Sequence, residues 1–155
     1  MLGVSVILWL LYGAFYILIG TLTPLMMDSK IGQPTLFVSN EADTRYYGES
    51  PESLMEREPA IHKLRNSIFL ALAALMTAAG LLVMCIAWFA LRVGQLWGLG
   101  ALVAAGVVVI PFYVLLFAPY VRVGAPIGLG HMMPFVLVPG VLLAPAALMG
   151  WWGLR

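Results

Sequence analysis

Charged side chains are scarce in this sequence. Only 10% of its 155 residues are charged and 63% are hydrophobic, whereas a soluble domain has about 25% charged and about 45–50% apolar residues. A chain of this length has too little interior to bury such an excess, so we expect lipid to surround most of it. The net charge of +1 and the lack of a run of basic residues argue against nucleic acid as a partner.

Cysteine and histidine are nearly absent. The single cysteine, Cys85, excludes an internal disulfide and a CxxC redox or zinc motif. The two histidines, His62 and His131, have no further histidine or paired acid spaced to complete a metal site. We therefore predict no metal.

The amino-terminal run lacks the features of a secretory signal. Residues 2–27 carry no charge, no basic residue precedes them and no small-residue cleavage site follows. The apolar core of a signal is only about 7–15 residues long, so we interpret this run as a retained membrane helix.

The sequence does contain four long uncharged runs, at residues 2–27, 66–91, 93–121 and 123–154. A helix needs about 20 apolar residues to cross a bilayer, and backbone amides in hydrocarbon must be satisfied within the segment itself. These runs predict an all-α fold, an integral membrane four-helix bundle made by a single domain, 1–155. We expect its spans near residues 3–27, 63–92, 95–118 and 131–153.

Proline distinguishes the predicted spans from one another. The second span has no proline and should be straight, whereas the third contains Pro111 and should end near Pro119. In the fourth, Pro134 suits an opening turn and the two later prolines should bend the helix. Because bends open gaps between helices, we expect a cavity between the third and fourth spans.

The acidic residues are confined to one segment. Six of the seven Asp and Glu residues lie within residues 41–65, and the seventh is Asp28. A carboxylate at the centre of a membrane helix costs about 2.5–3.5 kcal/mol on insertion scales, so we expect residues 28–62 to lie outside the membrane with their acids in water. Ser50 as N-cap and Pro51 as the first helical residue predict a short interfacial helix over residues 50–57.

Two further expectations concern this polar segment. Its apolar patch at residues 36–38 should pack back onto the helix ends, with a short strand as an alternative. Six Lys and Arg residues belong to its side of the membrane and two to the other side, which predicts a cytoplasmic polar segment.

We expect the protein in a bacterial cytoplasmic (inner) membrane.

Three residues are candidates for catalysis. Glu58 and His62 are four apart, with Arg65 three further on, so one helical face could present a carboxylate, an imidazole and a guanidinium for general acid–base chemistry. The alternative is an ordinary solvated helix start. His131 lies between long apolar stretches, and an ionisable residue in that position is either a ligand or proton site or a polar cap for a helix end.

A second set of residues is suited to ligand binding. Tyr12, Tyr16 and Tyr113 fall inside predicted spans, where their hydroxyls need hydrogen-bond partners and could line a pocket, or could simply join neighbouring helices. Arg122 and His131 would lie at the mouth of such a pocket.

The stretch "RVGQLWGLGALVAAGVVVIPFYVLLFAPY" combines a basic turn, an interfacial Trp and a mid-helix Pro. Together with one long extramembrane segment after the first helix and three closely spaced helices, it resembles DoxX-like small four-helix membrane proteins. The resemblance implies the four-helix fold. That group includes oxidoreductase-associated subunits as well as proteins without known roles, so it assigns no functional residue.

These observations leave two main hypotheses for function. The first is a non-catalytic accessory or assembly subunit that packs against other membrane subunits, or against copies of itself, through apolar helix faces. The alternative is a lipid- or quinone-binding protein or enzyme with its pocket between the third and fourth spans. A transporter is a weaker third hypothesis, because no inverted repeat is visible in the sequence.

Overall fold

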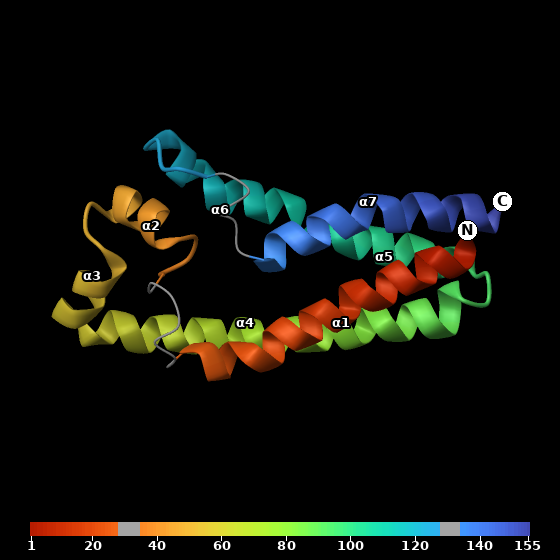
Figure 1. Cartoon of the computed structure of the whole chain (residues 1–155), viewed down its shortest axis with the longest axis horizontal. Helices are drawn as coiled ribbons and strands as arrows, with labels where there is room; N and C mark the ends of the chain where they lie inside the picture. The colour runs from red at the N-terminus through yellow and green to blue at the C-terminus, as the bar shows by residue number, and fades with distance from the viewer. Residues whose placement is uncertain (28–34, 128–133) are drawn as a thin grey trace.

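In the computed structural model, residues 1–27, 35–127 and 134–155 are described, and the regular elements among them are all helices. In chain order they are α1 (Leu2–Met27), α2 (Asn40–Tyr47), α3 (Pro51–Arg57), α4 (Pro59–Ile86), η1 (Ala87–Leu91), α5 (Leu96–Val108), α6 (Ile110–Arg122) and α7 (Pro134–Leu154). The long helices run along the long axis of the molecule (Figure 1). Helices α2 and α3 gather at one end, and both termini lie at the other (Figure 1).

Among the described residues, three helical stretches are long and apolar enough to cross a membrane. They are Leu2–Leu25, Pro59–Leu91 and Leu96–Arg122, and α7 contributes a shorter apolar stretch, Val138–Leu154. The predicted all-helical fold is confirmed for the described residues, and the first three predicted spans correspond to these stretches. The arrangement as four membrane spans stays a prediction.

Glycines allow α1 and α4 to approach each other closely. A Cβ atom placed on Gly80 would lie 2.6 Å from the Gly13 carbonyl oxygen, and one on Gly13 would lie 2.7 Å from the Gly80 carbonyl oxygen. Further along, a Cβ on Gly20 would lie 2.6 Å from the Ala73 carbonyl oxygen. Small residues of this kind let membrane helices pack backbone against backbone. We call these four residues the glycine seam.

The central core lies where α1 meets α5, η1 and α7. Its fully buried side chains include Trp9, Leu91 and Leu102. The Ser5 hydroxyl, also buried, donates a hydrogen bond of 2.7 Å to the Ala146 carbonyl oxygen and so joins α1 to α7. The first and fourth predicted spans are therefore directly connected.

The long helices are interrupted in two places. The second predicted span, expected to be straight, ends in the π-helical turn η1. The third is broken at Val109, just before Pro111, which has no N–H to donate and whose ring crowds the preceding turn. Beyond the break α6 continues through Pro119 to Arg122, past the expected end. Helix α7 begins at Pro134, as predicted.

Residues 35–57, which we call the cap, fold around α2 and α3. Helix α3 begins as predicted, with Pro51 in its first turn and the Ser53 amide donating to the Ser50 hydroxyl at 3.2 Å. Helix α2 was not predicted from the sequence. Its N-cap is Ser39, which accepts a hydrogen bond from the Ala42 amide, and Gly48 ends it with a φ of 77°.

The carboxylate of Asp43 is the centre of the cap. It is fully buried, so the expectation that every acid of this segment lies in water is wrong for Asp43. Its Oδ2 accepts from the amides of Leu36 and Phe37 at 2.7 and 3.1 Å, and its Oδ1 accepts from the amide of Val38 at 3.3 Å and from the Tyr120 hydroxyl at 3.0 Å. These four donors compensate the charge for the water it has lost.

Among the described residues, Tyr120 and Arg65 join the cap to the long helices. Tyr120, in the last turn of α6, bonds to Asp43 and stacks on Tyr46 with ring centroids 4.4 Å apart. Arg65, in α4, donates from Nε to the Thr35 carbonyl oxygen at 2.5 Å. Val38 of the apolar patch packs with Tyr120 in a small second core, which confirms that this patch packs onto a helix end.

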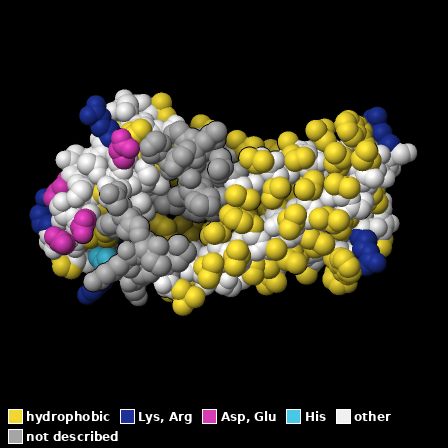
Figure 2. Space-filling model, in the orientation of Figure 1, with side chains coloured by type: hydrophobic (Ala, Val, Ile, Leu, Met, Phe, Trp, Pro, Cys, Tyr) yellow, Lys and Arg dark blue, Asp and Glu magenta, His cyan; other side chains and the backbone are white. Residues whose placement is uncertain are grey.

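The surface is divided into an apolar middle and charged ends. Figure 2 shows hydrophobic side chains over the long helices, with Lys and Arg at both ends and Asp and Glu at the cap end. At the end that carries the termini, Arg92 lies over the Trp88 ring at 4.2 Å and Arg155 over the Trp151 ring at 4.7 Å. Interfacial aromatic and basic residues of this kind are typical of membrane boundaries.

Candidate functional site

An elongated cavity of about 670 Å³ lies between α1, α5, α6 and α7. This volume is within the range of about 300–1,000 Å³ usual for ligand pockets. Its lining is almost entirely apolar or aromatic: Tyr12, Tyr16, Gly106, Val109, Ile110, Tyr113, Val114, Phe117, Ala118, Val121, Arg122, Pro139, Gly140 and Leu143.

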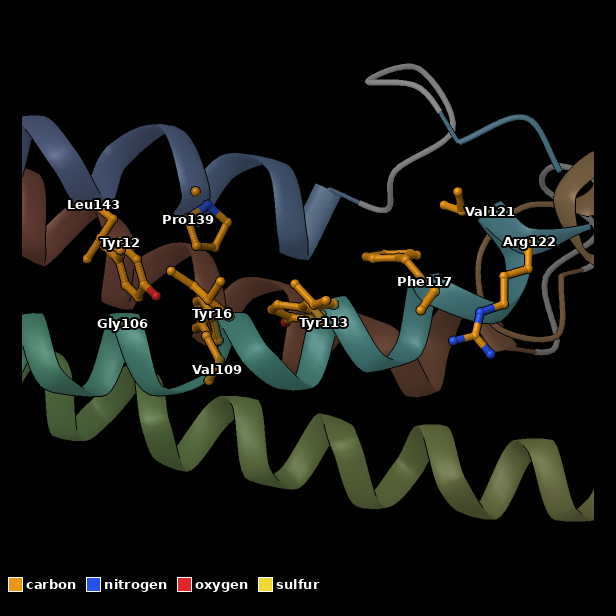
Figure 3. Close-up of a pocket in the computed structure, with 14 residues that line it drawn as sticks. Tyr12, Tyr16, Gly106, Val109, Tyr113, Phe117, Val121, Arg122, Pro139 and Leu143 are labelled. Atoms are coloured by element: carbon orange, nitrogen blue, oxygen red, sulfur yellow. The ribbon is translucent and has the colours of Figure 1, made fainter. Parts of the chain in front are cut away.

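Three tyrosines form the polar part of the inner cavity. The rings of Tyr12 and Tyr16 are stacked on α1, with centroids 5.1 Å apart and planes 9° from parallel. Tyr113, on α6, lines the same cavity, so phenol groups from both α1 and α6 belong to its wall. Figure 3 shows the three side chains in a row along the cavity. They supply hydrogen-bond donors to an otherwise apolar space.

Arg122 lies at the other end of the same row, beyond Phe117 (Figure 3). It belongs to the last turn of α6, where a cation also complements the helix dipole. Among the described residues that line the cavity, Arg122 carries the one ionic charge. The cavity therefore runs from neutral hydroxyl donors at one end to a guanidinium at the cap end.

Two glycines lie in the cavity wall. Gly140 of α7 is exposed, and a Cβ there would have no neighbouring atom within 4 Å. Gly106 differs, because a Cβ there would collide with the Leu143 side chain. The break at Val109 turns the chain between α5 and α6, whose residues both line the cavity.

The structure brings four of the five predicted ligand-binding residues together: Tyr12, Tyr16, Tyr113 and Arg122 all line the cavity. The fifth, His131, lies outside the described residues. The cavity borders α6 and α7, where the prolines of the third and fourth predicted spans indicated it, and α1 supplies a further wall. Sequence reasoning did not identify Phe117, Gly140 or Leu143, because apolar residues in an apolar run carry no distinguishing signal.

The candidate catalytic residues lie elsewhere. Glu58 and His62 are both exposed, at the start of α4, and do not line the cavity. Arg65, the third member of that set, is directed to Thr35 and to the Asn66 side chain instead. A catalytic role for Glu58, His62 or His131 stays a prediction. Within residues 1–27, 35–127 and 134–155, no three His, Cys, Asp or Glu side chains gather to hold a metal ion.

No protein-family model matches the chain, and comparisons with curated proteins and with solved structures give no match either. The resemblance to DoxX-like proteins therefore stays an expectation from sequence. A function can be argued only from the chemistry of the cavity itself.

Proposed function

We propose that this chain is an integral membrane protein with four spans, and that it binds an amphipathic molecule, a lipid or a quinone, in the cavity between α1, α5, α6 and α7. The observation that carries this proposal is an apolar cavity of about 670 Å³ with hydroxyl donors inside and one guanidinium at its cap end. An apolar chain fits the lining, and the few polar groups would orient the molecule.

The membrane part of the proposal rests on three candidate spans together with α7. Large apolar side chains such as Leu75, Phe89 and Phe112 are 67–72% exposed, and lipid is the solvent in which that exposure is favourable. Both termini lie at the end opposite the cap (Figure 1), and this requires an even number of crossings. Four crossings, with α7 as the last, satisfy that requirement.

A matched pair of glycine variants tests the binding site. Gly140 lines the cavity and Gly100 does not, yet a Cβ at either position meets no atom within 4 Å. Gly140→Phe adds a ring at the cavity wall and should obstruct binding there, whereas Gly100→Phe adds the same ring to the exposed surface of α5. Each variant, and the unaltered chain, would be purified in mild detergent and its bound lipids and quinones extracted and identified by mass spectrometry.

We expect a near-stoichiometric amphiphile with the unaltered chain and with Gly100→Phe, and its loss with Gly140→Phe. Equal amounts from all three proteins would contradict a site in the cavity. The mass of the extracted molecule then shows whether it is a lipid or a quinone.

The accessory-subunit hypothesis stays a prediction from sequence, and the same purification tests it. A membrane protein that co-purifies in fixed stoichiometry would support it. The cytoplasmic side of the cap and the bacterial inner membrane are likewise predictions, which proteolysis of sealed vesicles of known orientation can test.

A further inference from the structure

We infer that the molecule bound in the cavity is an anionic amphiphile, whose phosphate or carboxylate head is held by Arg122 and whose chain extends toward Tyr113 and Tyr16. This inference rests on the proposed function and narrows its ligand from any lipid or quinone to one with a negatively charged head.

The charge of the cavity favours an anion. Its described lining includes no acidic residue, and the structure pairs Arg122 with no carboxylate among the described residues. Two other arginines have partners: Arg57 forms an ion pair of 2.7 Å with Glu49, and Arg92 lies over an indole ring. No carboxylate of the described residues occupies the Arg122 guanidinium, whose planar shape matches a phosphate or a carboxylate with two parallel hydrogen bonds.

The position of Arg122 suits a head group. Arg122 lies at the cap end of α6, which is the polar boundary of the third candidate span. Tyr113 is nine residues earlier on the same helix, a distance of about 13 Å at 1.5 Å per residue. This approaches half the thickness of the hydrocarbon core, about 15 Å. A head at Arg122 would thus place its chain along Phe117 and Tyr113, into the middle of the membrane.

The cap fixes the helix turn that carries Arg122. Tyr120 is bonded to the buried Asp43 and stacked on Tyr46, so the last turn of α6 is tied to the cap two residues before the guanidinium. A turn that is already ordered loses less freedom when a ligand binds. Asp43 and Tyr120 are in this sense positioning residues for Arg122.

The test compares three probes with the same oleoyl chain: oleoyl lysophosphatidic acid, oleate and uncharged monooleoylglycerol. Their dissociation constants would be measured by native mass spectrometry on the full chain in detergent, for the unaltered protein, Arg122→Gln, Arg122→Lys, Arg92→Gln and Gly140→Phe. Arg122 is exposed and pairs with no described carboxylate, so Arg122→Gln should fold, and gel filtration checks that it does.

We expect the unaltered chain to prefer an anionic probe over monooleoylglycerol by roughly tenfold or more, the scale of a charge-assisted hydrogen bond. Arg122→Gln should abolish that preference, because the anionic probes lose the guanidinium that distinguishes them from monooleoylglycerol. Arg122→Lys should retain part of it, and Arg92→Gln all of it. Whichever anionic probe binds more tightly identifies the head as phosphate or carboxylate.

Three outcomes would contradict this inference, and each shows which part of it is wrong. If Gly140→Phe weakens all three probes but Arg122→Gln leaves their ratio unchanged, the cavity holds a chain and the anionic head is wrong. If Gly140→Phe weakens none of them, the proposed function itself is wrong. A short-chain ubiquinone that binds more tightly than either anion, and is lost in Tyr113→Phe, would also overturn the anionic assignment in favour of a quinone.

Discussion

The cap and the long helices of this molecule are held together by different means. In the cap, four hydrogen bonds converge on the single carboxylate of Asp43. Between α1 and α4, the contact is made by the glycine seam, in which backbone meets backbone. The proposed membrane location accounts for the difference, because burial from water would drive the folding of the cap, whereas lipid would offer the helices no hydrophobic gain and leave their association to close packing.

The glycine seam should give the largest effect when it is disturbed. Gly80→Leu would place a side chain where the Gly13 carbonyl oxygen lies 2.6 Å away, so α1 and α4 would have to separate. We expect a loss of stability of about 3 kcal/mol or more, measured by unfolding in mixed detergent micelles. Gly100→Leu, which has open space, is the control, and equal stability of the two variants would contradict the seam.

Asp43→Asn should have the next largest effect, and a local one. The amide nitrogen would face backbone amides that now donate to a carboxylate, so the cap should lose about 2–4 kcal/mol. Hydrogen exchange should rise across residues 35–57 while α1 and α4 stay protected. Uniform loss of protection in both regions would show that the cap and the long helices are not separate units. Glu49→Gln, which breaks only the surface pair with Arg57, should change stability by less than about 1 kcal/mol.

Tyr120→Phe tests the hydrogen bond that joins the cap to α6. It removes one of the four bonds to Asp43 and keeps the ring that stacks on Tyr46. We expect a loss of about 1.5–3 kcal/mol, the contribution of a hydrogen bond to a charged group, together with faster hydrogen exchange in the last turn of α6. An unchanged exchange rate in that turn would mean that the bond does not fix the position of Arg122.

Ser5→Ala should have the smallest effect. The hydroxyl of Ser5 joins α1 to the Ala146 carbonyl oxygen at 2.7 Å, but hydrogen bonds between membrane helices contribute only about 0.6 kcal/mol on average. Thermal unfolding in detergent should show a correspondingly small change. A loss as large as that of Gly80→Leu would mean that polar bonds, rather than close packing, hold the long helices together.

The sequence predicted the helices better than their contacts. Long uncharged runs and bounding charges are local signals, so the long helices, the N-cap at Ser50 and the opening turn at Pro134 were all predictable. Helix α2 also carries a local signal that was not recognised, with Ser39 before its first turn and Gly48 directly after its last. For the apolar patch beside it, packing onto the helix ends was predicted, with a short strand as the alternative, and α2 was not considered.

Long-range contacts had no such signal. The burial of Asp43 depends on a hydroxyl 77 positions away, on Tyr120, and nothing near either residue indicates the pairing. Gly13 and Gly20 can be recognised as small residues of the first span, but the sequence does not indicate which residues of α4 they contact. Tyr12, Tyr16, Tyr113 and Arg122 were predicted because polar groups are conspicuous in an apolar run, whereas Gly140, a glycine of the cavity wall, was not.

The most direct test of the cavity is photocrosslinking with an amphiphile that carries a diazirine in its chain. After irradiation of the protein in lipid nanodiscs and digestion, the labelled peptides are mapped by mass spectrometry. We predict saturable labelling of residues 12–16 and 110–118, competed by the unlabelled amphiphile and absent in Gly140→Phe. Labelling spread evenly over the exposed face of α4, at Leu72 and Leu75 for example, without saturation, would mean that the chain contacts only the outer surface and that the cavity binds nothing.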